Sequence, residues 1–99
     1  MLNKTVSVIA RVTSLPDKVE ELKSILLNLI EPTRSEKGCV SYQLLQDKTN
    51  SAEFVFIEEW TSESAENAHM TTSHVQDTLS KAQSLLAKAP DISKYVIIG

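Results

Sequence analysis

Both histidines of the chain, its only tryptophan and a carboxylate fall within one short stretch of sequence. The apolar segment 54–60 contains Glu58 and ends in Trp60, and His69 and His74 follow it. An imidazole changes charge near neutral pH, so it can act as a base or a hydrogen-bond donor. Aromatic side chains beside such groups are typical of a small-molecule pocket. We therefore expect an inward-facing His69 to act as the base, with Glu58 orienting its ring and Trp60 beside it.

The alternation of side chains along a strand places four residues of this segment on one face. They are Phe54, Phe56, Glu58 and Trp60. A buried carboxylate between aromatic rings is costly unless it is hydrogen-bonded. Glu58 therefore either accepts bonds from the backbone or the following helix, or orients a histidine or a substrate hydroxyl. Trp60 is either a core anchor or a pocket wall, and Phe56 is expected to hold the substrate ring.

Three further residues are candidates for substrate binding, and each has a structural alternative. His74 is either the weaker partner of His69 in an acid/base pair or a solvent-facing residue in the first turn of a helix. Arg34 lies either at the pocket mouth or in an exposed ion pair with Glu31, three residues away. Tyr42 is expected in the core, with its hydroxyl at an edge.

The sequence predicts neither a metal site nor a tightly held cofactor. Two histidines spaced as His-x4-His, without clustered cysteines, do not match a familiar zinc-ligand spacing. The only glycines are Gly38 and Gly99, so there is no glycine-rich phosphate loop. The single cysteine, Cys39, is expected to be a small buried hydrophobic residue rather than a nucleophile.

Length and composition indicate one small globular domain over residues 1–99. The chain is 41% hydrophobic and 23% charged, with ten basic and thirteen acidic residues for a net charge of −3. The basic residues are scattered, so no nucleic-acid partner is expected. No apolar run approaches the ~20 residues that span a bilayer, and Arg11 interrupts any signal-peptide layout. Together with a lone cysteine, these features predict a cytoplasmic protein.

The first half of the chain predicts a strand followed by a helix. Residues 4–13 alternate and are rich in β-branched side chains, which favours a strand. The helix begins either at Pro16 or through a capping pair of Asp17 and Glu20. Pro32 is expected to kink this helix. Its apolar stripe comprises Val19, Leu22, Ile25, Leu26, Leu29 and Ile30.

A hairpin should follow the first helix. Gly38 is the expected helix stop. Strands are predicted over 39–46 and 53–61, and the polar link 47–52 between them indicates an antiparallel pair.

The remaining chain predicts a divided helix and a last strand. Thr61 and Ser62 are candidate caps of a short helix that ends near Met70, and Ser73 with Gln76 forms a capping box that restarts it. The stripe of the second part comprises Val75, Leu79, Ala82, Leu85 and Leu86. A final strand over 92–98 is expected after the break at Pro90.

The resulting order, β-α-β-β-α-β, predicts an α+β, ferredoxin-like antiparallel sheet with both helices on one face. The other face would carry Ile9, Val55 and Ile57. Two helices cover only one side of a sheet, so a homodimer packed sheet against sheet is expected to cover the second.

Three segments together resemble the antibiotic biosynthesis monooxygenase (ABM) family of dimeric α+β-barrel proteins. They are 31–39 with Tyr42, Phe56 to Trp60, and Ala65 with 69–74. The resemblance covers nearly the whole chain and implies a pocket between sheet and helices in each subunit of a dimer. It also implies one of several activities: oxidation of quinols or anthrones by O2 without a cofactor, haem degradation, or isomerisation of a phosphorylated sugar. Some similar proteins have no known activity.

Two positions narrow the activities that the resemblance implies. The anthrone-oxidising members carry an Asn where this chain has Phe56, and the haem degraders carry an Asn where it has Ile9-Ala10-Arg11. The resemblance is therefore strongest to the quinol-oxidising and sugar-isomerising branch. We expect a cofactor-independent monooxygenase acting on a small quinol or phenol. The alternatives are an isomerase of a small, phosphorylated or unphosphorylated carbonyl compound, and a ligand-binding stress protein without turnover.

Overall fold

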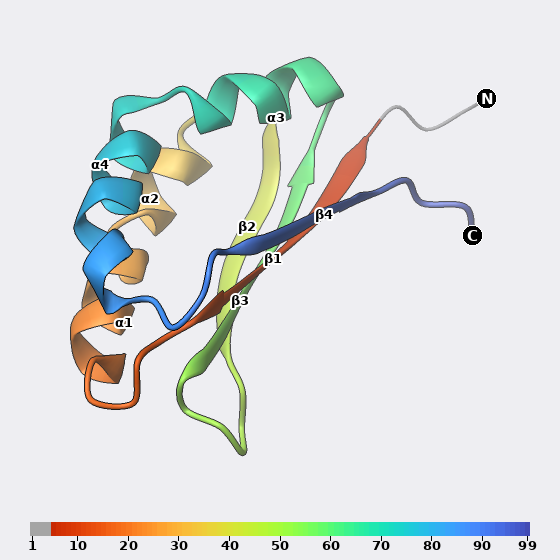
Figure 1. The fold of residues 1–99 in the computed structure, drawn as a ribbon. Coiled ribbons are helices and arrows are strands. Elements are labelled where there is room, and N and C mark those ends of the chain that lie inside the picture. Colours follow the sequence, from red (N-terminus) through yellow and green to blue (C-terminus); the bar gives the residue numbers. More distant parts are fainter. Residues whose placement is uncertain (1–4) are drawn as a thin grey trace.

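Residues 5–99 are described by the computed structural model, and they form four strands and a layer of helices. In chain order the elements are β1 (Val6–Thr13), α1 (Val19–Leu27), α2 (Ile30–Arg34), β2 (Cys39–Gln46), β3 (Glu53–Trp60), α3 (Glu63–Met70), α4 (Ser73–Ala82), the 3-10 helix η1 (Gln83–Leu85) and β4 (Asp91–Tyr95). The strands make one antiparallel sheet in the order β2-β3-β1-β4, and the helices cover one of its faces (Figure 1). The predicted ferredoxin-like order is confirmed.

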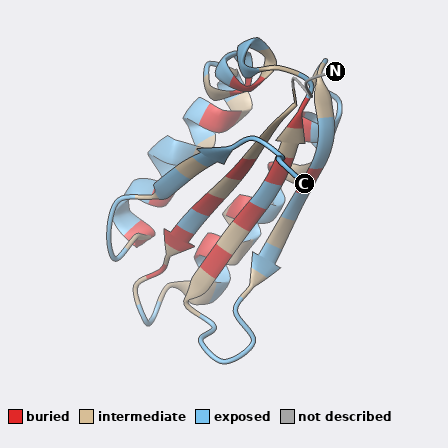
Figure 2. Cartoon of the chain, turned by 90° about the vertical axis from the view of Figure 1, so that its right-hand side faces the viewer, coloured by how far each residue is buried: buried red, intermediate tan, exposed pale blue. Residues whose placement is uncertain are grey.

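The two central strands, β3 and β1, supply most of the sheet's buried surface. Figure 2 shows buried and less buried residues alternating along them, while the outer strands are more exposed. The strand parity predicted for β3 is correct, because its helix-facing side chains Phe54, Phe56, Glu58 and Trp60 are all buried. Their opposite neighbours Val55, Ile57 and Glu59 are not. Side chains on the helix face of β3 are thus the natural floor of any cavity between the layers.

Pro32 divides the first helical region as predicted. α1 ends at Leu27, and the short α2 contains Pro32 at its third position. Proline has no N–H, and its ring clashes with the carbonyl four residues earlier. That residue is Asn28, the C-cap of α1.

The predicted start and stop of this region were wrong in detail. α1 begins at Val19, with Lys18 as an N-cap that makes no side-chain bond, so neither Pro16 nor an Asp17–Glu20 pair starts it. α2 ends at Arg34, well before Gly38. Gly38 instead turns the chain into β2 with a φ of +91°, in the left-handed region that favours glycine.

One predicted cap of the second helical region is confirmed and one is wrong. The Ser62 hydroxyl accepts a hydrogen bond from the Ala65 N–H at 3.1 Å and begins α3. α4 is capped by Thr72, whose hydroxyl accepts from the Val75 N–H at 3.4 Å, and not by Ser73. Gln76 reaches back to the Met70 carbonyl instead of completing a capping box.

The last strand is shorter than predicted. β4 ends at Tyr95, and Val96, Ile97 and Ile98 follow it as exposed apolar residues. At the other end, β1 begins at Val6, and the predicted strand residue Lys4 lies outside the described residues. Within residues 5–99, no helix has both the length and the apolarity needed to cross a bilayer.

Candidate active site

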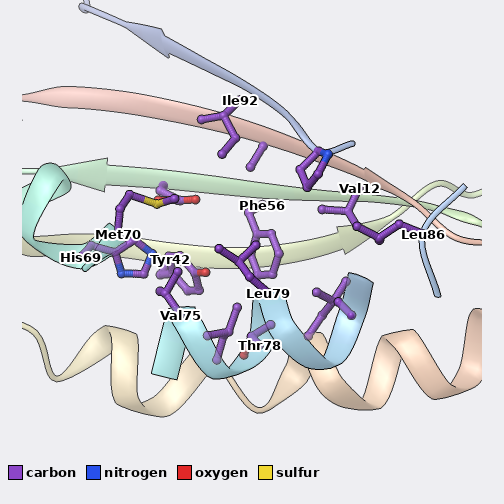
Figure 3. Close-up of a pocket in the computed structure, with 16 residues that line it drawn as sticks. Val12, Tyr42, Phe56, His69, Met70, Val75, Thr78, Leu79, Leu86 and Ile92 are labelled. Carbon is purple, nitrogen blue, oxygen red and sulfur yellow. The ribbon is translucent and has the colours of Figure 1, made fainter. Parts of the chain in front are cut away.

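A cavity of about 70 Å³ lies between the sheet and the helices (Figure 3). Strands β1, β2 and β3, the start of β4, and helices α1, α3 and α4 all contribute to its wall. Most of the lining is apolar, from Ala10 and Val12 on the sheet to Val75 and Leu79 on α4. Its polar groups are the side chains of Tyr42, Glu58, His69 and Thr78. The cavity therefore suits an apolar ring that carries one or two hydroxyl groups.

Glu58 is held by the tryptophan that follows it on the same face of β3. The indole Nε1–H of Trp60 donates a buried hydrogen bond of 2.9 Å to Glu58 Oε1. Trp60 is fully buried and does not line the cavity, so it is a core anchor that supports the wall. The prediction that Glu58 orients His69 is wrong, because its hydrogen-bond partner is Trp60.

The carboxylate that orients His69 comes from a different part of the chain. Glu36 lies in the turn between α2 and β2, and its Oε2 atom is 2.7 Å from His69 Nδ1. The same oxygen is 2.7 Å from His74 Nε2. Backbone bonds from Glu36 N–H to Thr33 and from Cys39 N–H to the Glu36 carbonyl hold this turn in place. Sequence reasoning missed Glu36 because it lies 33 and 38 residues from its two partners.

This contact determines which nitrogen of His69 is left for a ligand. A carboxylate only accepts hydrogen bonds, so the neutral ring carries its proton on Nδ1 and has a lone pair on Nε2. Among the described residues, Nε2 has no hydrogen-bond partner. The ring is 3% exposed and packs against Trp60 and Tyr42, with centroid separations of 4.7 Å and 5.6 Å. His69 is therefore a fixed, buried imidazole at the cavity wall with one nitrogen available.

The other predicted site residues divide between cavity and surface. Phe56 and Tyr42 line the cavity, as do Glu58 and His69. His74 is partly exposed and points to Glu36 rather than freely to solvent, but it does not line the cavity. Arg34 is not in an ion pair with Glu31; its guanidinium donates two hydrogen bonds to the Tyr42 carbonyl, of 3.1 Å and 2.8 Å. Arg34 thus stabilises the backbone behind Tyr42 from outside the cavity.

Burial makes ionisation unfavourable for the acidic groups around the cavity. It raises the pKa of Glu58, and the Trp60 N–H and the nearby His69 only partly offset this effect. The pKa of Tyr42 is raised by burial and by Glu58, which lies opposite it on the neighbouring strand. Burial and the carboxylates of Glu36 and Glu58 also raise the pKa of Cys39, which favours the unreactive thiol.

The raised pKa of Glu58 predicts a pH dependence of stability. Between the ordinary value of 4.5 and the higher folded-state pKa, the folded protein holds a proton that the unfolded chain releases. The stabilisation is complete below pH 4.5 and is lost as the pH rises through the folded-state pKa. Relative to Glu58→Gln, which keeps an acceptor for Trp60 and does not titrate, the wild type should therefore lose unfolding free energy with rising pH.

Urea unfolding followed by Trp60 fluorescence between about pH 4 and about pH 8 measures this difference. Glu59→Gln, which makes the same change on the opposite face of β3, is the matched control. A constant difference between wild type and Glu58→Gln across this range would contradict the assignment.

The fold and site define a class of small α+β protein, in which a ferredoxin-like sheet and its helices enclose a cavity with a Glu-oriented histidine. The antibiotic biosynthesis monooxygenase profile matches residues 5–81, and the chain belongs to this family. The family resemblance inferred from the sequence is confirmed.

Individual relatives agree with this assignment. "Putative monooxygenase YcnE" of Bacillus subtilis is 32% identical over 77 residues, covering 78% of this chain and 81% of the relative. The uncharacterized protein sll1783 of Synechocystis sp. is 39% identical over 82 residues, covering 83% of this chain but only 56% of that longer protein. The crystal structure of PA3566 from Pseudomonas aeruginosa superposes with a TM-score of 0.92 at 29% identity, covering 100% of this chain and 99% of that one.

Proposed function

We propose that this protein is a cofactor-independent monooxygenase that oxidises a small quinol or phenol with O2 in the cavity between sheet and helices. The observation that carries the proposal is the Glu36–His69 pair, with the free Nε2 of His69 at the cavity wall. In this role His69 accepts the phenolic proton, Glu36 orients the ring and stabilises the imidazolium, and Phe56 holds the substrate ring. The apolar lining excludes water from the electron-rich anion.

The reaction balances without an external reductant. The substrate anion gives four electrons to O2; one oxygen atom forms a new carbon–oxygen bond on the ring and the other leaves as water. The ring C–H and the hydroxyl groups supply the two hydrogens of that water, so a hydroquinone yields a hydroxyquinone. The protein's part is to remove the first proton and to hold the anion in a dry, fixed position.

The size and charge of the cavity support this substrate class. A volume near 70 Å³ corresponds to roughly five water positions, which favours a single ring over a fused polycycle. Neither Arg11 nor Arg34 lines the cavity, and Arg11 is exposed. A phosphorylated substrate therefore finds no arginine there, and this disfavours the phosphosugar alternative.

Oxygen consumption with a panel of single-ring hydroquinones tests the proposal. We expect uptake that depends on the chelator-treated protein, with one atom of 18O2 in the quinone product. Hydrogen peroxide in place of labelled product would identify an oxidase. Proton exchange at a substrate carbon without O2 would identify an isomerase. Tight binding without product would identify a ligand-binding protein, and no uptake with any quinol would exclude the proposed class.

We also propose that the protein is a homodimer that packs sheet against sheet. The face of the sheet away from the helices carries Ile57, Leu45 and Tyr95, which are 40%, 42% and 49% exposed. The apolar residues 96–98 extend this uncovered surface beyond β4. An apolar sheet face of this kind is typically covered in solution by another surface.

A charge at the centre of this face should separate the subunits. Ile57 lies on the inner strand β3 between Gln43 and Ile9, so Ile57→Lys would bury an unpaired ammonium group in the dimer. We expect analytical ultracentrifugation to give twice the 11.0 kDa chain mass for the wild type and the single mass for the variant. Leu27→Lys, at a 50% exposed position on α1, should leave the dimer intact. A monomeric wild type would refute the dimer.

A further inference from the structure

Glu36, His69 and His74 bring three metal-ligating groups together outside the cavity. The carboxylate oxygen and the two ring nitrogens all lie within 4.8 Å of one another. They come from three different segments: the turn before β2, the last turn of α3 and the first turn of α4. Two imidazoles and one carboxylate form a ligand set that binds zinc, cobalt and related divalent ions.

The surroundings of the cluster favour a site that is fixed on one side and accessible on the other. The His69 side chain is 4% exposed, while those of Glu36 and His74 are 13% and 24% exposed. Packing against Trp60 and Tyr42 fixes His69, so little order remains to be imposed when an ion binds. Glu36 and His74 do not line the cavity, so an ion bound here lies behind the His69 ring and is separated by it from a cavity ligand.

We propose that Glu36, His69 and His74 form a binding site for one divalent transition-metal ion of the zinc class. The two 2.7 Å contacts are hydrogen bonds in the metal-free protein. Ligand atoms around a tetrahedral zinc ion lie about 3.3 Å apart, so the ion replaces the two bridging protons as Glu36 moves back slightly. Water can complete the coordination on the exposed side.

Metal binding at these atoms has a specific consequence for both rings. In the metal-free protein the neutral rings carry their protons on Nδ1 of His69 and Nε2 of His74, because both nitrogens face Glu36. The ion takes those two nitrogens, so the remaining protons move to Nε2 of His69 and Nδ1 of His74. His69 then presents an N–H to the cavity and cannot accept a proton there. The site would therefore switch off the proposed base without touching the substrate.

Two measurements on untagged, chelator-treated full-length protein test the proposal without requiring turnover. Co²⁺ should quench the fluorescence of the only tryptophan, because Trp60 lies 4.7 Å from the His69 ring. We expect saturation at one ion per chain and reversal by Zn²⁺. Nitrogen-15 NMR of the two histidines should show both tautomers inverting when Zn²⁺ is added. Unchanged tautomers, or no saturable quenching, would overturn the proposal.

Matched variants identify the ligands. Glu36→Gln and His74→Gln should each weaken Co²⁺ binding by more than the roughly 10- to 100-fold cost of losing an outer-shell partner. Glu31→Gln, which removes a carboxylate from the exposed side of α2, should bind like the wild type. Wild-type affinity in Glu36→Gln would overturn the site. Failure of these tests leaves quinol oxidation by metal-free protein unaffected, so the two proposals fail independently.

Discussion

His69→Gln is expected to lower kcat/KM for aerobic quinol oxidation by roughly 10²- to 10⁴-fold, the usual contribution of a general base. Glutamine keeps a polar side chain of similar reach but cannot accept the phenolic proton. The loss should appear mainly in kcat, because the apolar lining that binds the ring is unchanged. Initial rates of O2 uptake over a range of quinol concentrations measure both parameters.

Two matched variants separate proton transfer from packing in this experiment. His74→Gln changes the other histidine on Glu36 without changing the cavity wall, so its rate should fall far less. Glu36→Gln keeps a hydrogen-bond acceptor for His69 but removes the charge that stabilises the imidazolium, so an intermediate loss is expected. Circular dichroism of each variant controls for folding.

Wild-type activity in His69→Gln would remove this residue from the mechanism. Glu58 would then be the remaining candidate base, since it lines the cavity and its pKa is raised. Glu58→Gln distinguishes these cases, because it should abolish oxidation only if Glu58 accepts the proton.

Gly38→Ala is expected to lower the free energy of unfolding by about 2–4 kcal/mol, the largest effect on stability among the changes considered. A Cβ at this position would lie 2.6 Å from Ala65 Cβ and 2.9 Å from Thr61 Oγ1. The φ of +91° adds strain for any residue with a side chain. Urea unfolding followed by Trp60 fluorescence measures the change.

Ala65→Gly tests the steric part of this prediction. It removes the nearest atom, so the double variant should recover part of the stability lost in Gly38→Ala, even though glycine within α3 itself costs about 1 kcal/mol. The φ strain should remain. A loss well below 1 kcal/mol in Gly38→Ala would show that the turn can rearrange at little cost.

The same position links stability to the site. Gly38 lies two residues after Glu36, and its contact with Ala65 determines how closely this turn approaches α3, which carries His69. The Gly38 carbonyl also accepts a 2.8 Å hydrogen bond from the Thr61 N–H. A side chain at position 38 would push the turn and the helix apart, so Gly38→Ala should weaken the Glu36–His69 contact as well as the fold.

The fold was predictable from the sequence because its elements follow local periodicity. Alternation along β3 placed Phe56, Glu58 and Trp60 on one face, and Pro32 correctly marked the division of the first helical region. The errors were at boundaries, such as the start of α1 and the cap of α4. There several polar residues lie within one turn, and only the packed chain selects one of them.

What the sequence by itself determined was a cavity-facing carboxylate and a tryptophan on one strand, because strand parity is a local property. Which carboxylate meets His69 was decided by the tertiary structure. Glu58 and Glu36 are chemically equivalent, but the Trp60 N–H binds Glu58, while the turn at Gly38 brings Glu36 to both imidazoles. Contacts between residues more than thirty positions apart depend on how turns and helices pack, and no local spacing encodes them.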